Sequence, residues 1–536
     1  MNLNHLKYKL IRKLFKFPVE RTPKRGFIII QVDGLSYEAF KFAIEKNYFP
    51  KLKKLIKRNE FSYKMFKTSL PSNTPYFQKV LFYGDTTKYP GFRWIDKKNK
   101  KYYSFKLPET AELEEKKIKQ KNLVGILKNG ASYYNIFSGD AQRNYLVLSK
   151  ILTKSISSKI GGLKLLLIIL LNIPTMLRVL FWSLREIFRE FSDWFYFYIN
   201  NLPQRDFKLF PIIRIFNNVI VNEYITQGVC MEIICGTPKI FATYNAYDEA
   251  SHQRGVDSKS SFKVLKLIDK SIWKIYKMTK NKKNFRKYDI FILSDHGQKK
   301  SLPFSFIFKK KFSDLILKYE KNFKITETGY EMSALPIIEK IKLLSKERKI
   351  PKFVGLLFPE INSKKFKITK NFHENIKIIN FGSFSQIYFL NFQEKLTFEK
   401  INKIYPLFLL HILSHKSVKF LVVEDNKENV IILEKSGFIK VNNKKIIEKS
   451  GKISIPMETI YEIEELAKSE HAGDILIFGN IINGKLINFE GQMSSHGTFY
   501  DEEINCFLVF PSLKKEKMKK IQSVLDLHNF FKSNYQ

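Results

Sequence analysis

The sequence is poor in cysteine and in acidic residues. Its three cysteines are Cys230, Cys235 and Cys506. An odd number without the paired spacing of a metal site excludes a disulfide framework and predicts reduced core residues. Lys and Arg total 93 against 51 Asp and Glu, a formal net charge of +42. Because lysines are spread along the whole chain, this excess does not single out one anionic partner, and we expect no specific nucleic-acid recognition.

Long uninterrupted apolar runs are also missing. Residues 1–25 are basic but contain no apolar stretch long enough for a signal peptide. Leu6, Leu10 and Leu14 fall on one face of a predicted basic amphipathic helix, which either lies on an anionic membrane or packs on the protein. Residues 163–184 are the most apolar part of the chain, but Lys164, Asn172, Pro174 and Arg178 interrupt them. A membrane span needs about 20 apolar residues, so a clean span is not expected there.

Residues 289–298, DIFILSDHGQ, carry the strongest local signal. Four apolar residues in a row, 290–293, predict a buried parallel strand, because such strands are covered on both faces and need not alternate. Asp295 and His296 follow at its carboxyl end, where open α/β sheets place their sites. A carboxylate beside an imidazole suits Zn²⁺ or Mn²⁺. In isolation the pair would be more typical of a strand end with a surface histidine.

Two further segments repeat or extend this pattern. Residues 26–32, GFIIIQV, predict a second buried strand that ends at Asp33. The segment PSNTP at 71–75 precedes a helical pattern, which places Thr74 near a helix N-terminus. Main-chain N–H groups and the helix dipole favour a phosphate at such a position. For this triplet alone, a threonine that merely caps the helix is the simpler interpretation.

The remaining candidates are an Asp/His pair and a late histidine. Asp248 and His252 follow a predicted strand at 238–244 and are four residues apart, so on a helical turn they share a face and can bind one ion. The whole candidate set is Asp33, Thr74, Asp248, His252, Asp295, His296 and His496. Three carboxylates, three imidazoles and a hydroxyl could hold two divalent ions about 4 Å apart and clamp a phosphoryl group for in-line displacement.

The motifs that contain these residues resemble those of the type I phosphodiesterase/nucleotide pyrophosphatase family of the alkaline phosphatase superfamily. They occur in the family's order, as VDG at 32–34, PSNTP at 71–75, YDEASH at 247–252, SDHG at 294–297 and SHG at 495–497. The resemblance implies two ions, usually zinc, one held by Asp33, Thr74, Asp295 and His296 and the other by Asp248, His252 and His496. It also implies that Thr74 is the nucleophile and forms a phospho-threonine that water hydrolyses, since a coordinated hydroxyl has a lowered pKa.

One part of the family pattern is missing. Many relatives carry an Asn after the nucleophile helix that contacts the phosphoryl group, whereas the loop at 89–94 has none. Arg93 is a candidate replacement, because a guanidinium binds phosphate oxygens bidentately; a structural surface arginine is the alternative. A sulfatase would need Cys or Ser in a Cys/Ser-x-Pro-x-Arg context, which residues 74–76 do not supply, so sulfate esters are disfavoured.

The order of these residues constrains the apolar insert. Asp33 and Thr74 precede residues 163–184 and Asp248 follows them, so a single membrane crossing would divide the site. We therefore expect a Pro-kinked amphipathic insert at a membrane surface, with Arg178, Arg185 and Arg189 near lipid phosphates; a buried helical hairpin is the alternative.

The predicted fold class is α/β, with an alkaline-phosphatase-like, mostly parallel central sheet flanked by helices, an apolar helical insert and a mixed α+β inserted subdomain. The expected segments are an N-terminal amphipathic segment (1–25), a catalytic domain in three parts (26–150, 237–300 and 471–536), the insert (151–236) and a capping region (301–470).

The expected function is metal-dependent hydrolysis of phosphate esters, most specifically as a phosphodiesterase or nucleotide pyrophosphatase, in the cytoplasm or at the membrane periphery. The alternatives are a phosphomonoesterase, a lipid-headgroup phosphotransferase at the membrane, or a non-catalytic membrane-surface binding protein of the same fold.

Overall fold

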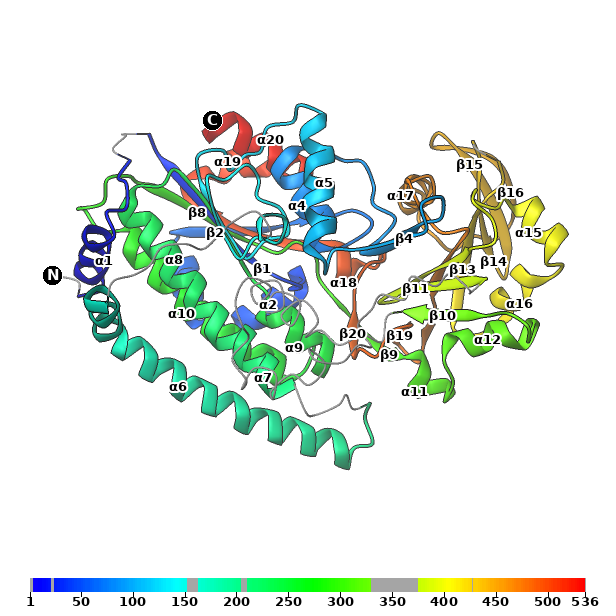
Figure 1. Cartoon of the computed structure of the whole chain (residues 1–536), viewed down its shortest axis with the longest axis horizontal. Coiled ribbons are helices and arrows are strands. Elements are labelled where there is room, and N and C mark those ends of the chain that lie inside the picture. The colour runs from blue at the N-terminus through cyan, green and yellow to red at the C-terminus, as the bar shows by residue number, and fades with distance from the viewer. Residues whose placement is uncertain are drawn as a thin grey trace.

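A seven-stranded sheet in the order β2-β21-β8-β1-β7-β5-β6 forms the centre of the larger part of the molecule (Figure 1). The computed structural model describes residues 3–20, 24–151, 162–203, 210–328, 375–426 and 428–535. Strand β21 runs antiparallel to both of its neighbours, while β8, β1, β7, β5 and β6 are mutually parallel. The predicted α/β class with a mostly parallel central sheet is confirmed. The strands are β1 (Gly26–Val32), β2 (Phe61–Lys67), β5 (Ala131–Tyr133), β6 (Arg143–Tyr145), β7 (Lys239–Tyr244), β8 (Tyr288–Leu293) and β21 (Asn505–Pro511).

Helices cover both faces of this sheet because its strands are apolar on both sides. In β1, Phe27 and Ile29 pack into one core with α4, α5 and α20, whereas Ile28 and Ile30 pack into the opposite core with α2, α3, α8 and α10. The helices and short elements of this part are α1 (Leu3–Leu14), α2 (Tyr37–Glu45), α3 (Pro50–Lys57), α4 (Thr74–Tyr83), β3 (Arg93–Asp96), β4 (Lys101–Ser104), α5 (Pro108–Gln120), α6 (Gly162–Ile199), α7 (Phe210–Ile215), α8 (Asn222–Cys235), α9 (Ala246–Arg254), α10 (Lys259–Thr279), α18 (Asp501–Ile504), α19 (Lys515–Lys519) and α20 (Val524–Tyr535).

A second, eight-stranded sheet forms the smaller part, in the order β10-β11-β12-β17-β13-β14-β15-β16. Its one parallel pair is β10 with β11, and its other pairs are antiparallel. The elements are β10 (Ile325–Thr328), β11 (Ile376–Phe381), β12 (Phe384–Phe389), β13 (Val418–Glu424), β14 (Val430–Glu434), β15 (Gly437–Asn442), β16 (Lys445–Gly451) and β17 (Ile475–Gly479), with α12 (Phe312–Tyr319), α15 (Phe398–Ile404), α16 (Phe408–Ser414) and α17 (Met457–Ala467) against it.

A four-stranded sheet connects the two parts, in the order β18-β19-β9-β20. Its members are β9 (Lys299–Pro303), β18 (Ile481–Ile482), β19 (Lys485–Asn488) and β20 (Ser494–Ser495), and α11 (Phe304–Phe308) follows β9. The chain thus leaves the central sheet through β9 and returns through β20. Strand β17 belongs to the second sheet, which therefore extends beyond the boundary predicted at residue 470. Parts of the predicted insert (152–161 and 204–209) and of the predicted capping region (329–374) lie outside the described residues.

Residues 163–184 lie within one helix, α6, that continues to Ile199. The alternative of a buried helical hairpin is wrong, because Leu177 and Leu180 are exposed. Helix α1 packs on the protein through His5 and Tyr8, while Leu6 and Leu10 of the predicted apolar face point outward. Among the described residues, no helix is long and apolar enough to cross a bilayer. The three cysteines are buried and free, as predicted.

Candidate active site

Three neighbouring parallel strands bring the candidate ligands to one edge of the central sheet. Strand β1 lies between β8 and β7, so the carboxyl ends of all three point the same way. Asp33 directly follows β1, Asp295 and His296 follow β8, and α9 begins two residues after β7 and carries Asp248 and His252. His496 follows the short strand β20. Residues more than 460 positions apart therefore meet at this edge.

Thr74 is the first residue of α4, and its neighbour Asn73 caps the helix. The Asn73 side chain accepts a hydrogen bond from the Tyr76 main-chain nitrogen at 3.0 Å. The interpretation of Thr74 as the capping residue is therefore wrong. Its hydroxyl instead donates to Asp33 Oδ1 at 3.4 Å and lies 3.4 Å from His296 Nε2.

One group of candidate ligands surrounds the Thr74 hydroxyl. His296 Nε2 lies 3.4 Å from Asp33 Oδ1 and 3.4 Å from Asp295 Oδ2. Asp33, Asp295 and His296 are all buried, and each offers an atom within 4.8 Å of the others. Asp295 Oδ2 has no hydrogen-bond partner among the described residues, although it is fully buried. A buried carboxylate oxygen without a donor is typical of a ligand aimed at a cation.

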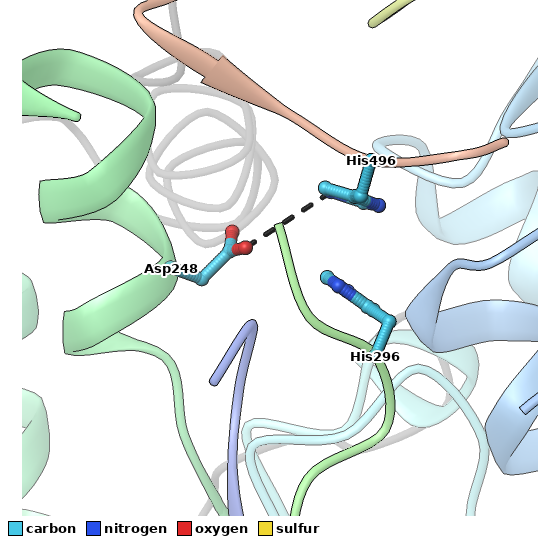
Figure 2. Close-up of side chains that lie close together, drawn as sticks. All are labelled: Asp248, His296 and His496. Carbon is cyan, nitrogen blue, oxygen red and sulfur yellow. Dashed lines mark ion pairs between the residues drawn. The ribbon is translucent and has the colours of Figure 1, made fainter. Parts of the chain in front are cut away.

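A second group lies beside the first. Figure 2 shows Asp248, His296 and His496 pointing toward one another from three segments of the chain. Asp248 Oδ1 lies 4.0 Å from His496 Nε2, and Asp248 Oδ2 lies 3.3 Å from His252 Nε2. The rings of His296 and His496 stack with their centroids 3.8 Å apart. The structure thus brings together all seven predicted residues, and His296 lies next to both groups.

The three histidines share one orientation. The Nδ1 atom of each lies within hydrogen-bonding distance of a main-chain carbonyl: His252 with Ser494 at 2.8 Å, His296 with Gly297 at 3.0 Å and His496 with Ser72 at 2.8 Å. A carbonyl oxygen only accepts, so Nδ1 carries the proton in each ring. The Nε2 lone pairs are then directed into the site, which is the arrangement that metal-binding histidines adopt.

The pKa values reflect an excess of buried negative charge. Burial, together with the charges of Asp295 and Asp248, raises the pKa of Asp33 well above its usual range. Burial and the Asp248 charge raise the pKa of Asp295 to about 6. Burial lowers the pKa of His496 to about 3, and the neighbouring His296 contributes to this shift. The His252 pKa moves the other way, because the Asp248 carboxylate raises it to about 8 despite burial. Binding of a divalent cation requires unprotonated ligands, so His296 and His496 are already in the form that a cation needs, while His252 would release its proton.

Five of the seven residues, Asp33, Thr74, Asp248, His252 and His496, line a cavity of about 210 Å³. The apolar lining residues are Phe92, Phe105, Ile136, Leu146, Leu148 and Phe381, and the Phe381 ring lies 5.2 Å from that of His496. A larger cleft of about 1000 Å³ lies among α4, α5 and α17, but none of the seven residues lines it. The predicted site residues therefore gather at the smaller cavity.

Arg93 lines the same cavity, but it is not a surface residue. Its side chain is buried, and Nη1 lies 2.9 Å from Glu490 Oε1 and 3.0 Å from the Asn380 carbonyl. Arg93 therefore forms a buried ion pair with Glu490, a partner that the sequence did not indicate. The surface-arginine alternative is wrong.

Sequence reasoning missed several polar residues of the site. Asn135 and Asn245 line the cavity just beyond the ends of β5 and β7, the same position relative to a strand that identified Asp33. Gln298 donates from Nε2 to Asp248 Oδ1. Behind His496, the buried Glu503 accepts from the main-chain nitrogen of Thr498 at 2.7 Å and from its hydroxyl at 2.8 Å. No sequence signal marks Glu503, because its role depends on a fold that brings residues 72 and 503 together.

The sheet and the groups at its edge place the chain among α/β proteins with a candidate metal centre. Residues 200–352 match the model of the type I phosphodiesterase/nucleotide pyrophosphatase family. The match confirms the resemblance drawn from the motifs, and its range contains Asp248, His252, Asp295 and His296. No curated protein matches the sequence.

Solved structures of low sequence identity cover most of the chain. Phosphonoacetate hydrolase from Sinorhizobium meliloti 1021, in complex with phosphonoformate, is 11% identical with a TM-score of 0.45, covering 97% of this chain and 99% of that chain. Murine ectonucleotide pyrophosphatase/phosphodiesterase 5 in complex with AMP is 10% identical with a TM-score of 0.41, covering 91% and 88%. The human protein is 9% identical with a TM-score of 0.42, covering 94% and 93%.

Proposed function

We propose that this protein is a metal-dependent hydrolase of phosphate esters, most specifically a phosphodiesterase or nucleotide pyrophosphatase that acts through a phospho-threonine at Thr74. The family match over residues 200–352 supports a phosphoester hydrolase. The observation that carries the finer proposal is the Thr74 hydroxyl, which takes no part in capping α4 and lies 3.4 Å from both Asp33 Oδ1 and His296 Nε2.

The proposed ligands are those implied by the family resemblance. Asp33, Thr74, Asp295 and His296 would hold one divalent ion, and Asp248, His252 and His496 the other, with zinc as the proposed metal. The group of Asp33, Asp295 and His296 supports the first set. For the second set, Asp248 and His496 belong to a group that includes His296, and His252 is brought in by its Nε2 atom, 3.3 Å from Asp248 Oδ2. When bound, divalent cations lower the pKa of a coordinated hydroxyl and neutralise charge on phosphoryl oxygens.

In the proposed reaction, Thr74 Oγ attacks phosphorus while the bond to the leaving-group oxygen breaks. Asp33 orients the Thr74 hydroxyl by accepting its hydrogen bond. The N-terminal end of α4 directs its positive dipole at the phosphoryl group. A water molecule then hydrolyses the phospho-threonine and restores the Thr74 hydroxyl, releasing the phosphorylated product.

The cavity supports a diester over a monoester. A phosphodiester carries one charge and a second organic substituent, which can pack against the apolar lining residues Phe92, Phe105 and Phe381. Arg93 is proposed to bind substrate, and its place in the cavity lining supports that role. Its ion pair with Glu490 reduces the charge it brings, so it fits the single charge of a diester better than the two charges of a monoester.

The test is a comparison of bis(4-nitrophenyl) phosphate, 4-nitrophenyl phosphate and a nucleoside 5′-(4-nitrophenyl) phosphate, with metal content measured on the same samples. We expect turnover of the diesters that disappears on chelation and returns with Zn²⁺ or Mn²⁺. A clear preference for the monoester would favour the phosphomonoesterase alternative. Binding of metal without turnover of any substrate would favour the non-catalytic alternative.

A further inference from the structure

Helix α6 has two faces of opposite character. Glu186, Glu190 and Phe197 point inward and are buried. Leu177 and Phe188 point outward, with 62% and 73% of their surface exposed. The outward face continues along the helix through Ile173, Leu177, Leu180, Leu184, Phe188, Phe191 and Phe195, all of them exposed. Their spacing of three or four residues places them on a single stripe, which is too long and too apolar to be scattered surface residues.

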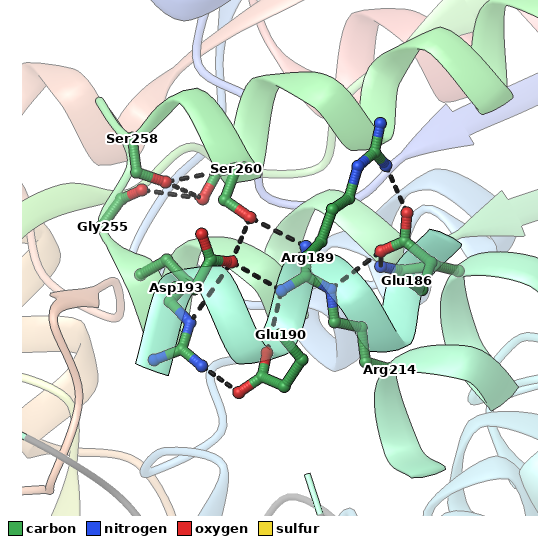
Figure 3. Close-up of polar contacts among 11 residues, drawn as sticks. Glu186, Arg189, Glu190, Asp193, Arg214, Gly255, Ser258 and Ser260 are labelled. Carbon is green, nitrogen blue, oxygen red and sulfur yellow. Dashed lines mark hydrogen bonds and ion pairs between the residues drawn. The ribbon is translucent and has the colours of Figure 1, made fainter. Parts of the chain in front are cut away.

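All three acidic residues of α6 are turned toward the protein. Figure 3 shows Arg214 between Glu186, Glu190 and Asp193. The Arg214 guanidinium lies 2.8 Å from Glu186, 2.9 Å from Glu190 and 2.7 Å from Asp193. Arg189, expected from the sequence to face lipid, is instead paired with Glu186. The negative charges of the helix are therefore neutralised on its inner side.

The same network joins α6 to the candidate site. Arg254 is the last residue of α9, the helix that carries Asp248 and His252. It pairs with Glu190, lies 3.7 Å from Asp193, and covers the Phe197 ring with its guanidinium 4.9 Å from the ring centroid. Because a buried charge is costly without its partner, these contacts fix the position of α6 relative to α9.

Basic residues flank the apolar stripe. Arg178 and Arg185 of α6 are exposed at its sides, and Arg178 is also paired with Glu223 of α8 at 2.9 Å. Helix α1 contacts the N-terminal part of α6, since Lys7 Nζ donates to Asn172 Oδ1 at 2.7 Å. Helix α1 contains no acidic residue and exposes Leu6, Leu10 and Lys13. We call the outward stripe of α6 together with the exposed residues of α1 the α1–α6 surface.

We propose that the α1–α6 surface docks on an anionic lipid bilayer. Its apolar stripe is rich in phenylalanine and suits the acyl boundary of such a bilayer. Its flanks carry basic residues, which suit the negative headgroups, and the acidic residues of α6 face the protein. With 38 residues, α6 is about 57 Å long, nearly twice the roughly 30 Å of a hydrocarbon core, so it fits along the bilayer surface. The contacts of Arg254 then hold the candidate site at a fixed position relative to the lipid.

The proposal goes beyond the proposed function, because it concerns binding and does not depend on catalysis. The test is flotation of the full chain with vesicles of phosphatidylcholine alone and of phosphatidylcholine with 30% phosphatidylglycerol. We expect binding to the anionic vesicles that weakens as salt is raised, because the basic flanks are screened. Absence of binding at low salt, or equal binding to neutral vesicles, would overturn the proposal.

A matched pair of variants tests the surface itself. Leu177→Ser with Phe188→Ser alters the stripe, while Leu410→Ser with Ile447→Ser alters residues of similar exposure (60% and 56%) on the second sheet and its helices. The first pair should lower vesicle partitioning about tenfold or more, and the second should leave it unchanged. Circular dichroism and turnover of a soluble diester should match wild type in both. If the Leu177→Ser/Phe188→Ser variant partitions like wild type, the surface does not bind lipid. If light scattering shows a wild-type dimer that is lost in this variant, the surface binds a second copy of the chain.

Discussion

Asn73 caps helix α4 and thereby leaves the hydroxyl of its neighbour Thr74 directed at His296. The Asn73 side chain takes the Tyr76 main-chain N–H at 3.0 Å, while Thr74 Oγ1 lies 3.4 Å from His296 Nε2. Asn73 thus has a structural role in capping the helix, whereas the role proposed for Thr74 is chemical. Substitution at each position should separate stability from activity.

Thr74→Ala should abolish diester turnover with little change in stability, because the residue contributes no capping bond. Asn73→Ala should cost about 1 kcal/mol of unfolding free energy through loss of the cap. Urea unfolding and steady-state kinetics measure the two effects. Turnover by Thr74→Ala near the wild-type rate would show that a water molecule attacks the substrate directly.

Metal affinity should fall as the pH drops below about 6. The pKa of Asp295 is raised to about 6, and a protonated carboxyl cannot ligate a cation. Calorimetric titration with Zn²⁺ from pH 5 to 7.5 should show binding that strengthens with pH and releases protons. At 100-fold excess over the dissociation constant, metal should stabilise the fold by about 2.7 kcal/mol. An affinity independent of pH would place the ion away from Asp295.

Glu503 should act as a positioning residue for His496. Its carboxyl group accepts hydrogen bonds from the Thr498 main-chain nitrogen and the Ser72 hydroxyl, and the Ser72 carbonyl accepts one from His496 Nδ1. Glu503→Ala leaves these donors unsatisfied and should weaken metal affinity by about 10- to 100-fold. Glu503→Gln keeps an acceptor and should restore most of that affinity. Equal loss in both variants would show that an amide at this position does not replace the contacts of the carboxyl group.

Comparison of Glu503 with the Glu503→Gln variant also tests how stability depends on pH. Burial raises the pKa of Glu503 to about 8 from a usual value of 4.5. An acid with a raised folded pKa holds its proton in the folded state after the unfolded chain has released it, so stability falls as pH rises from 4.5 to 8. Glu503→Gln removes this titration. The stability of the variant relative to wild type should therefore rise across that window, as measured by urea unfolding at each pH.

Arg93→Ala should reduce stability by about 3–5 kcal/mol, because it leaves Glu490 buried without its partner. The double variant Arg93→Met with Glu490→Gln should lose much less. If Arg93 also binds the phosphoryl group, this stable double variant should have a raised KM for the diester. A KM equal to that of wild type would show that Arg93 has a structural role and does not bind the substrate.

Most of the candidate residues could be found from sequence because they follow an apolar strand or lie near the start of a helix. That pattern placed β1 at residues 26–32 and Asp33 at its end. His252 was found from its spacing to Asp248, and His496 from the SHG motif of the family. The roles of Asn73 and Arg93 could not be found this way. Both depend on contacts with main-chain or side-chain atoms that only the folded chain supplies, such as Tyr76 N and Glu490.

The character of α6 was also only partly predictable. Its apolar content was evident, but the sequence does not show which face is covered. The inward position of Glu186 and Glu190 follows from Arg214 and Arg254, which lie on other helices. Pairing between helices is set by packing, and local periodicity carries no information about it.

Strand β21 also determines when the protein can become complete during synthesis. It lies between β2 and β8, so β2 from the first part of the chain gains its sheet neighbour only from residues near the end. At roughly 5–20 residues per second on the ribosome, tens of seconds separate the synthesis of β2 from that of β21. His496 emerges only shortly before β21. The nascent chain therefore has an unpaired β2 and an incomplete set of candidate ligands until residues 496–511 have been made. Synthesis of this one segment both fills the gap in the sheet and completes the candidate site.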